Sequence, residues 1–285
     1  MDWRGRRESS NIEDRRGMGM GGMGGRPIRL GGIGLVVVLL LGAFFGVDLS
    51  GMVGPGDTSR QASTTSAPGD PQAEEYKAFV SVVLAETEDV WGAIFKASNL
   101  TYEDPTLVLF SGVTRSACGA AQSAMGPFYC PVDHKVYLDT DFFDVMRRQL
   151  GSQGEFARAY VVAHEVGHHV QNQLGVLGQV NEMRARVSEA RSNALSVRVE
   201  LQADCYAGVW ANAARDRLSV TDDDIRSALD TAARIGDDAL QKAAQGYAVP
   251  DSFTHGTSEQ RQNWFYRGFR SGDPDQCDTF NANSL

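Results

Sequence analysis

Apolar side chains recur every three or four positions along much of the second half of the chain, which is the spacing of an amphipathic helix. The same spacing between Glu75 and Asn99 predicts one long helix there. Thr221 is followed by three aspartates, a pattern typical of a capping box at a helix start. A long polar helix is predicted from about Val180 through Glu200 to Ala214. Further helices are predicted from Thr221 to about Ile235, from Asp237 to Ala244 and, capped by Ser258, through Arg270.

Shorter apolar segments predict strands. Leu107–Phe110 is a run of four large apolar residues, typical of a short buried strand. Pro127–Pro131 and Lys135–Asp139 are extended segments on either side of a Val-Asp-His turn, whereas the small residues at 119–127 predict a loop. Helices outnumber these strands, so the sequence predicts a mainly α fold with a small β-sheet, of the α+β class.

The first quarter of the chain differs in composition from the rest. Residues 1–29 are rich in Arg, Gly and Met and are expected to form a disordered basic arm. Residues 30–47 form an uncharged apolar run, about 27 Å long as a helix, which predicts one transmembrane helix. Residues 48–72 are rich in Gly, Ser, Thr, Pro and Ala and are expected to be a flexible linker. The globular domain is then expected at 73–285.

Charges on either side of the apolar run indicate its orientation. Arginines precede it, whereas two aspartates and no Lys or Arg follow it before Arg60. The positive-inside rule therefore places the N-terminus in the cytoplasm and the domain outside, held in the cell membrane by a single pass. A cleaved signal peptide is the alternative, but the arginine-rich segment is long and no A-x-A site follows the run. The lack of charge in the run argues against a buried core helix.

The net charge of the chain bears on its partners. It is −9, and the pI is about 5.1. The expected outer domain therefore offers no basic face for nucleic acid. The basic N-terminal arm suits the anionic lipid of an inner leaflet. Nothing in the sequence indicates an oligomeric state.

Candidate chemistry is concentrated in the apolar segment Ala159–Val170, which is long enough for a buried helix and contains H-E-x-x-H. His164 and His168 are four positions apart, so on a helix both imidazoles lie on one face and can reach one zinc ion. Glu165 is placed to reach a water on that ion and to act as general base. His169 points about 100° away from His168 and is not expected to be a ligand. An ordinary core helix with hydrogen-bonded histidines is the alternative.

A second motif, in Val199–Asp204, supplies what the first lacks. A catalytic zinc usually has three protein ligands and one open position, and Glu200 is the candidate third ligand. Asp204 lies one helical turn later and can accept a hydrogen bond from the far ring nitrogen of a ligating histidine, which fixes its tautomer. The E-x-x-x-D pattern alone is weak, because surface helices often carry it. Apolar residues follow it here, and buried carboxylates are costly without a metal or another partner.

The pairing of H-E-V-G-H with E-L-Q-A-D resembles the gluzincin metallopeptidases, in which two helices supply two histidines and a glutamate. Met1–Ser9 and Asp14–Gly17 resemble the start of the bacterial membrane-anchored neutral zinc metallopeptidase family (the YpfJ type), and the resemblance covers almost the whole chain. It implies a zincin-like domain, a Zn2+ cofactor and a protein or peptide substrate. It also implies that a strand beside the metal helix binds substrate backbone. Tyr129–Leu138 is the candidate for that edge, and an ordinary hairpin is the alternative.

The resemblance extends to two later residues. His255 and Arg261 lie in a loop and a first helical turn well after the metal motifs. Their spacing resembles a His…Arg pair that stabilises the oxyanion in some membrane gluzincins, which implies a catalytic role. A capping or ion-paired role is the alternative.

All four cysteines follow the apolar run. In a domain outside the cytoplasm, an even count favours two disulfides. Cys118 with Cys130 would close a short loop beside the proposed edge strand, and Cys205 with Cys277 would pin the C-terminal tail to the second metal helix. Sequence does not decide among the three possible pairings, and reduced buried cysteines are the alternative. The absence of C-x-x-C spacing argues against zinc binding by cysteine.

These motifs predict a membrane-anchored zinc metalloendopeptidase that hydrolyses peptide bonds with a zinc-activated water. Glu165 would take the proton of that water and deliver it to the leaving amine. One alternative is a zinc-binding adaptor without proteolytic activity, which would have no use for Glu165. The other is an amidase that acts on cell-wall peptides, which substrate screening would separate.

Overall fold

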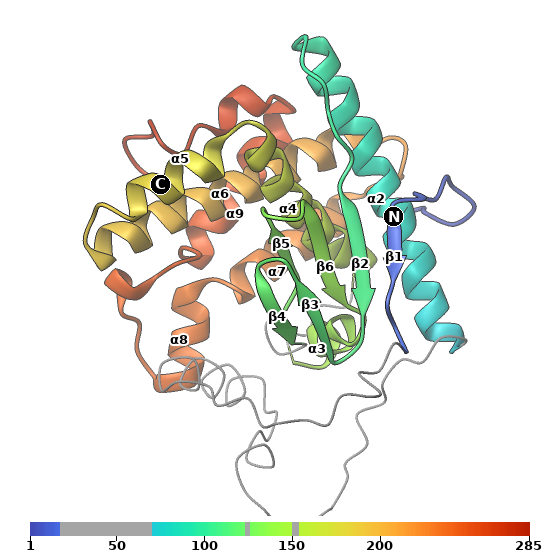
Figure 1. Ribbon diagram of the computed structural model, residues 1–285, viewed down its shortest axis with the longest axis horizontal. Coiled ribbons are helices and arrows are strands. Elements are labelled where there is room, and N and C mark those ends of the chain that lie inside the picture. Colours follow the sequence, from blue (N-terminus) through green and yellow to red (C-terminus); the bar gives the residue numbers. More distant parts are fainter. Residues whose placement is uncertain (18–69, 123–125, 150–153) are drawn as a thin grey trace, which may run out of the picture.

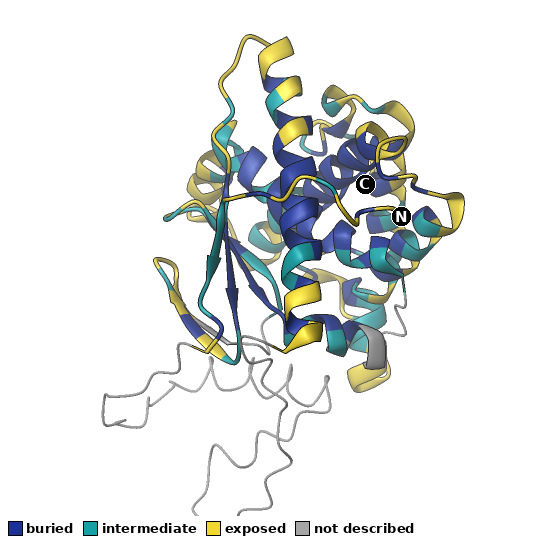
Figure 2. Ribbon diagram, turned by 90° about the vertical axis from the view of Figure 1, so that its right-hand side faces the viewer, coloured by how far each residue is buried: buried dark blue, intermediate teal, exposed yellow. Residues whose placement is uncertain are grey.

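A computed structural model describes residues 1–17, 70–122, 126–149 and 154–285 of the chain. Within these ranges a small sheet has most of the helices on one side (Figures 1 and 2), which confirms the predicted mainly α fold with a small sheet. The strands are β1 (Ile12–Asp14), β2 (Thr106–Phe110), β3 (Val113–Ser116), β4 (Gly119–Gln122), β5 (Phe128–Cys130) and β6 (Lys135–Asp139). The helices are α2 (Pro71–Ala97), α3 (Asp141–Gln149), α4 (Glu155–Gln173), α5 (Val176–Arg184), α6 (Glu189–Ala214), α7 (Asp222–Arg234), α8 (Asp237–Gln245) and α9 (Ser258–Ser271), with short 3-10 turns η3 (Pro250–Ser252) and η4 (Pro274–Cys277).

The main sheet is mixed and has the strand order β1-β2-β6-β5. β2 is parallel to both β1 and β6, whereas β5 runs antiparallel to β6. The predicted pair of extended segments around a turn is therefore confirmed, and His134 takes a left-handed conformation in that turn (φ 59°). β5 forms one edge of the sheet, but β6 lies inside it. Of the predicted edge at Tyr129–Leu138, only the β5 part is at an edge.

The two faces of this sheet pack differently, because alternate side chains of a strand point to opposite faces. Leu107 and Leu109 belong to the main core, which includes apolar side chains of α2 and α4. Val108, Phe110 and Tyr137 form a smaller apolar cluster on the other face. Burial on both faces explains why β2 is a continuous apolar run rather than an alternating one.

A second, two-stranded sheet is formed by the antiparallel strands β3 and β4. The small residues at 119–127 predict a loop, and β4 corrects that prediction for the first four of them. Gly, Ala and Gln carry no apolar alternation, so the strand left no periodic signal. A disulfide between Cys118, beside β4, and Cys130, in β5, joins this hairpin to the main sheet.

Helices α4 and α6 form the centre of the helical layer, and α9 packs along α6. The crossing of α6 and α9 is tight, because a Cβ on Gly268 would overlap the carbonyl oxygen of Cys205. A second disulfide joins Cys205 on α6 to Cys277 in the C-terminal tail. Both candidate pairings, Cys118 with Cys130 and Cys205 with Cys277, are thus present, and the described cysteines include no free thiol.

Two predicted helix boundaries need correction. The helix predicted from Val180 to Ala214 is two helices, α5 and α6. Ser188 ends the break between them in the extended conformation of an N-cap (φ −66°, ψ 160°). The last helix is capped by Thr257 rather than by Ser258, through a capping box in which Thr257 and Gln260 satisfy one another's backbone N–H groups.

The predicted disorder of residues 1–29 is wrong for residues 1–17. Strand β1 pairs with β2 in the register Ile12 to Leu107. The Trp3 side chain is 6% exposed and lies edge-on to Phe79, with 5.4 Å between ring centroids. Figure 1 shows this segment beside α2. The strand is three residues long and pairs with a partner far along the chain, so local periodicity could not reveal it.

The remaining predictions for the first quarter of the chain fall outside the described residues. These are the rest of the basic arm, the transmembrane helix at 30–47 and all but the last three residues of the linker at 48–72. Among the described residues, no helix combines the length and the apolar character that a membrane crossing requires.

Candidate metal centre

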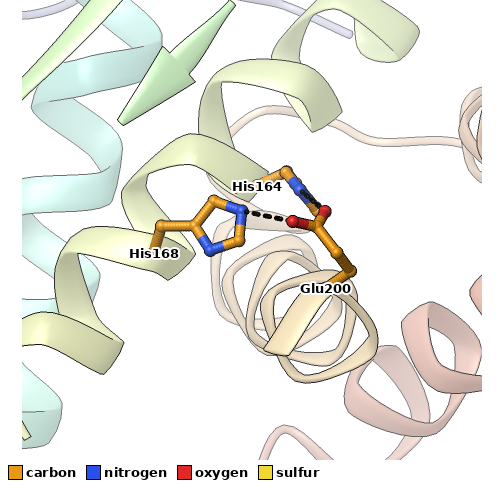
Figure 3. Close-up of side chains that lie close together, drawn as sticks. All are labelled: His164, His168 and Glu200. Atoms are coloured by element: carbon orange, nitrogen blue, oxygen red, sulfur yellow. Dashed lines mark hydrogen bonds and ion pairs between the residues drawn. The ribbon is translucent and has the colours of Figure 1, made fainter. Parts of the chain in front are cut away.

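Three of the predicted site residues meet between α4 and α6 (Figure 3). The Nε2 atom of His164 lies 3.2 Å from one carboxylate oxygen of Glu200, and the Nε2 atom of His168 lies 3.6 Å from the other. One ligand atom from each of the three residues lies within 4.8 Å of the others. Tetrahedral zinc with bonds of about 2.0–2.2 Å needs neighbouring ligand atoms about 3.4 Å apart. Two imidazoles and a carboxylate in this arrangement fit a zinc ion and leave its fourth position open.

Close packing of the two helices brings Glu200 to the histidines. Gly167, between the two histidines, faces the backbone of Ala203 on α6. A Cβ at position 167 would lie 3.0 Å from the Ala203 carbonyl oxygen and 3.2 Å from its Cα, which is tighter than ordinary contact. The glycine in H-E-V-G-H therefore permits the separation at which α6 can supply a ligand.

Asp204 holds His164 from the side away from the metal position. Its Oδ1 lies 2.8 Å from the Nδ1 of His164. A carboxylate accepts hydrogen bonds, so Nδ1 donates to Asp204 and Nε2, on the side of Glu200, is the ring nitrogen left to bind a metal. Burial disfavours the charge on Asp204, but Arg261 and His164 outweigh burial and lower its pKa to about 2. Asp204 is therefore ionised at neutral pH.

Arg261 is buried against the same carboxylate. Its Nε donates to Oδ2 of Asp204 at 2.8 Å and its Nη2 donates to Oδ1 at 2.9 Å. Tyr160 donates from its hydroxyl to Oδ1 at 2.5 Å and accepts from Nη2 of Arg261 at 3.2 Å. Arg261 is 3% exposed, so its fork is directed at Asp204 rather than toward open solvent. This agrees with the ion-paired alternative for Arg261. Sequence reasoning missed Tyr160, which lies one turn before His164 on α4.

Negative charge surrounds the two histidines. Burial would lower the pKa of His164, yet Asp204 and Glu200 raise it to about 10. Burial also disfavours the charge on Glu200, but His168 and His164 hold its pKa below the usual range. The centre therefore favours positive charge between its ligands, which a divalent cation would supply.

Glu165 lies in the same cavity and is 7% exposed. Burial raises its pKa above the usual range for glutamate, partly opposed by the neighbouring His164 and His168. A carboxylate with a raised pKa is a better proton acceptor than an exposed one, which suits the role predicted for it.

His255 also lines this cavity and is positioned by Asp237 at the start of α8. Oδ2 of Asp237 accepts hydrogen bonds from the backbone N–H groups of Thr254, His255 and Gly256 at 2.6–3.0 Å. Its Oδ1 lies 3.2 Å from the Nδ1 of His255. The side chain of His255 is 51% exposed, so it is only partly desolvated; this desolvation opposes protonation, but the hydrogen bond to Asp237 and the charge of Glu200 raise its pKa. Sequence reasoning missed Asp237, because the contact depends on the fold of the loop.

The cavity that contains these side chains has a volume of about 490 Å³. Besides the polar residues described above, its lining is mainly apolar and comes from β5, α3, α4, α5, α6 and the segments around α8. It includes Phe128, Phe142, Val161, Leu177, Ile235 and Leu240. The edge strand β5 borders the cavity directly.

His169 connects the metal helix to that strand. Its Nδ1 lies 3.1 Å from the Tyr129 hydroxyl on β5, and its Nε2 lies 2.6 Å from the carbonyl oxygen of Glu103. The carbonyl requires a donor, so Nε2 carries the proton and Nδ1 accepts from Tyr129. Burial lowers the pKa of His169 to about 4, so the ring is neutral. His169 thus faces away from the metal position, in line with its expected exclusion as a ligand.

Comparison with known proteins bears on this site. A family model described as "Putative neutral zinc metallopeptidase" matches residues 1–280. The uncharacterised protein YpfJ of Escherichia coli (strain K12) is 51% identical over 285 residues, which cover 98% of this chain and 99% of that protein. The uncharacterised protein Rv2575 of Mycobacterium tuberculosis (strain ATCC 25618 / H37Rv) is 47% identical over 218 residues, 73% of each chain. No solved structure matches the chain.

The matched region contains both metal motifs and the N-terminal segment at residues 1–17. The family implies Zn2+ as cofactor, and His164, His168 and Glu200 form a group that could hold it. A peptidase family also implies a protein or peptide as substrate. The chain belongs to the neutral zinc metallopeptidase family.

Proposed function

We propose that this protein is a zinc-dependent endopeptidase in which Glu165 is the general base. The observation that carries the proposal is the convergence of His164, His168 and Glu200 on one point beside a buried glutamate, in a cavity open to an edge strand. When bound there, zinc would acidify a water molecule and polarise the scissile carbonyl group.

Proton transfer, stabilisation of the oxyanion and positioning of the ligands are assigned to different side chains of the protein. Glu165 accepts the proton of the attacking water and passes it to the amine that leaves. Protonated His255 donates a hydrogen bond to the oxygen that becomes negative as the carbonyl carbon turns tetrahedral. Arg261 and Tyr160 act through Asp204, which holds His164, so they are positioning residues rather than catalytic ones.

Substrate binding is proposed along β5. Within the part of the chain that the structure describes, no strand pairs with the outer edge of β5. The strand borders the cavity and is held to the metal helix through His169. An extended peptide could pair with that edge and place apolar side chains against the largely apolar walls. We therefore expect cleavage beside large apolar residues in unfolded chains.

The test compares three forms of the full-length protein, because residues 1–17 are part of the fold. The wild type, Glu165→Gln and a matched control, Glu182→Gln on the exposed face of α5, are assayed on an unfolded protein. Zinc content is measured in each. We expect Glu165→Gln to keep zinc and to lose about 10²–10⁴-fold in rate. The control should behave as the wild type.

Other outcomes would separate the alternatives. Zinc bound with no cleavage by the wild type would favour the adaptor, unless cell-wall peptides are hydrolysed, which would favour the amidase. Equal rates for wild type and Glu165→Gln would show that Glu165 is not the base. A wild type that binds no zinc would overturn the ligand assignment.

A further inference from the structure

A row of buried amides lies behind His168 and has no counterpart in the predicted site. The Nδ1 of His168 lies 2.8 Å from Oε1 of Gln171, one helical turn later on α4. Nε2 of Gln171 donates to the carbonyl oxygen of Val199 at 2.8 Å and to Oε1 of Gln202 at 3.0 Å. Nε2 of Gln202 then donates to the carbonyl oxygen of Cys277 at 3.1 Å. The row links α4 to α6 and to the C-terminal tail.

The direction of every hydrogen bond in this row is fixed by its ends. Backbone carbonyl oxygens only accept, so the amide nitrogens of Gln171 and Gln202 must face Val199 and Cys277. The oxygen of Gln171 is then left facing His168. An amide oxygen is an acceptor, so Nδ1 of His168 donates to it and Nε2 is the ring nitrogen left to bind a metal. That nitrogen is the one directed at Glu200, 3.6 Å away.

We propose that Gln171 is a positioning residue that fixes the tautomer and ring orientation of His168 for metal binding. Gln202 and the tail at Cys277 hold Gln171 in that orientation. This inference rests on the metal site of the proposed function but not on its peptidase activity. Gln171 and Gln202 are 0% and 6% exposed, so a wrongly turned amide would leave buried polar atoms unpaired.

The disulfide between Cys205 and Cys277 completes the support. It fastens the tail that supplies the last acceptor to the same helix, α6, that carries Glu200 and Gln202. The hydrogen bonds of Gln171 and Gln202 thus connect the proposed ligand His168 to a segment that the disulfide holds in place.

The test measures metal affinity in the full-length protein by competition with a chromophoric chelator. Gln171→Met keeps the length of the side chain but removes both of its hydrogen-bonding functions. We expect zinc affinity to fall about 10–100-fold. The control is Gln262→Met, which removes another glutamine that donates to a backbone carbonyl, that of Leu229. It should lose stability similarly and keep wild-type zinc affinity.

A second measurement separates positioning from a general loss of stability. Cobalt(II) bound in place of zinc has an absorption spectrum that depends on its ligand geometry. We expect that spectrum to change in Gln171→Met and not in Gln262→Met. Wild-type zinc affinity and an unchanged cobalt spectrum in Gln171→Met would overturn the inference. If the wild type binds zinc but cleaves nothing, only the peptidase proposal fails.

A different observation supports a second inference, about residues 1–17. The α-amino group of Met1 is partly buried and lies 3.1 Å from a carboxylate oxygen of Asp224, at the start of α7. The side chain of Arg16 is fully buried and donates to Asp14 at 2.6 Å and to Glu74 on α2 at 2.9 Å. Buried charges are tolerated only while their partners stay in place.

We infer that residues 1–17 are a fixed part of the domain and share one compartment with residues 70–285. The pairing of β1 with β2 could not form if a membrane separated them. The inference therefore competes with the predicted single crossing that leaves the N-terminus in the cytoplasm and the domain outside.

Labelling of single cysteines tests this in bacterial cells that make the full chain. The four native cysteines are all in disulfides, so an added one is the reactive thiol. Ser10→Cys reports the N-terminal segment and Arg186→Cys reports the domain, since both positions are exposed. Each purified variant must first react with one equivalent of maleimide.

With a maleimide that does not cross membranes, we expect both variants to be labelled under the same condition. The two disulfides favour an oxidising compartment, so that condition should be intact cells. Labelling of both variants only after lysis would also place residues 1–17 and 70–285 in one compartment. Labelling of one in intact cells and of the other only after lysis would overturn the inference.

Discussion

The two histidines of the metal centre are held by chemically different partners. His164 faces a buried charged group, in which Asp204 is paired with Arg261. His168 faces a neutral amide, Gln171, in a row that ends on a backbone carbonyl. Both partners leave Nε2 free for a metal, so both serve orientation. Only the carboxylate also adds negative charge, which makes its histidine a more basic ligand.

The difference has consequences for stability. A charged partner in a buried site depends on its own counter-ion, because an unpaired buried charge is very costly. A neutral amide depends instead on having all its hydrogen bonds made. Losing one hydrogen-bond partner of a buried amide costs less free energy than leaving a buried charge unpaired. Damage on the His164 side should therefore appear first as unfolding, and damage on the His168 side first as weaker metal binding.

The largest expected effect comes from removing the ion pair between Arg261 and Asp204, which supports His164. Arg261→Met keeps the bulk of the side chain and leaves Asp204 buried without its main partner. We expect the free energy of unfolding of the zinc-free protein to fall by about 3–5 kcal/mol. Urea denaturation followed by circular dichroism measures it. The matched change Arg267→Met, on the exposed face of α9, should have little effect; a comparably small effect of Arg261→Met would contradict the charged description.

An intermediate effect is expected from removing the Cys205–Cys277 disulfide, which holds the tail that supports Gln171 and His168. Cys205→Ala with Cys277→Ala opens a disulfide whose cysteines are 72 positions apart. Long closed loops give the larger entropic stabilisation, so we expect a loss of about 2–5 kcal/mol together with weaker zinc binding. The control pair is Cys118→Ala with Cys130→Ala, 12 positions apart. It should cost less stability and leave zinc affinity unchanged. Equal zinc affinity in both double variants would argue against coupling between the tail and His168.

The smallest expected effect concerns the pH dependence of activity and involves His255, which lines the same cavity as the two histidines. Nδ1 of His255 is occupied by Asp237, so its Nε2 can donate a hydrogen bond only when the ring is protonated. Because Asp237 raises the pKa of His255, the protonated ring persists to higher pH, and activity should fall as pH rises through that pKa.

Asp237→Asn removes the charge that raises this pKa, so the alkaline fall in kcat/KM should move to lower pH. His255→Gln, which donates without titrating, should abolish that fall. The pH dependence of kcat/KM measured for all three proteins checks this. An alkaline limb that stays in place in both variants would show that another group is responsible.

Sequence reasoning predicted features whose spacing is local. The group of His164, His168 and Glu200 that could hold a metal was predicted from H-E-x-x-H and E-x-x-x-D, because helical geometry places residues four apart on one face. Helices α2, α7 and α8 were predicted close to their observed bounds for the same reason. Even the two cysteine pairs were named, although the sequence left three pairings open.

Tertiary structure decided what depends on segments distant in sequence. Gln171 has no recognisable signal, because its role exists only when α6 and the tail at Cys277 lie against α4. Arg261 became a partner of Asp204 because α9 packs tightly on α6 at Gly268. Strand β1, short and polar, gained its place only through a partner far along the chain. Local sequence thus determined which side chains could bind a metal. Long-range packing determined which groups orient them, because those contacts form only once the chain has folded.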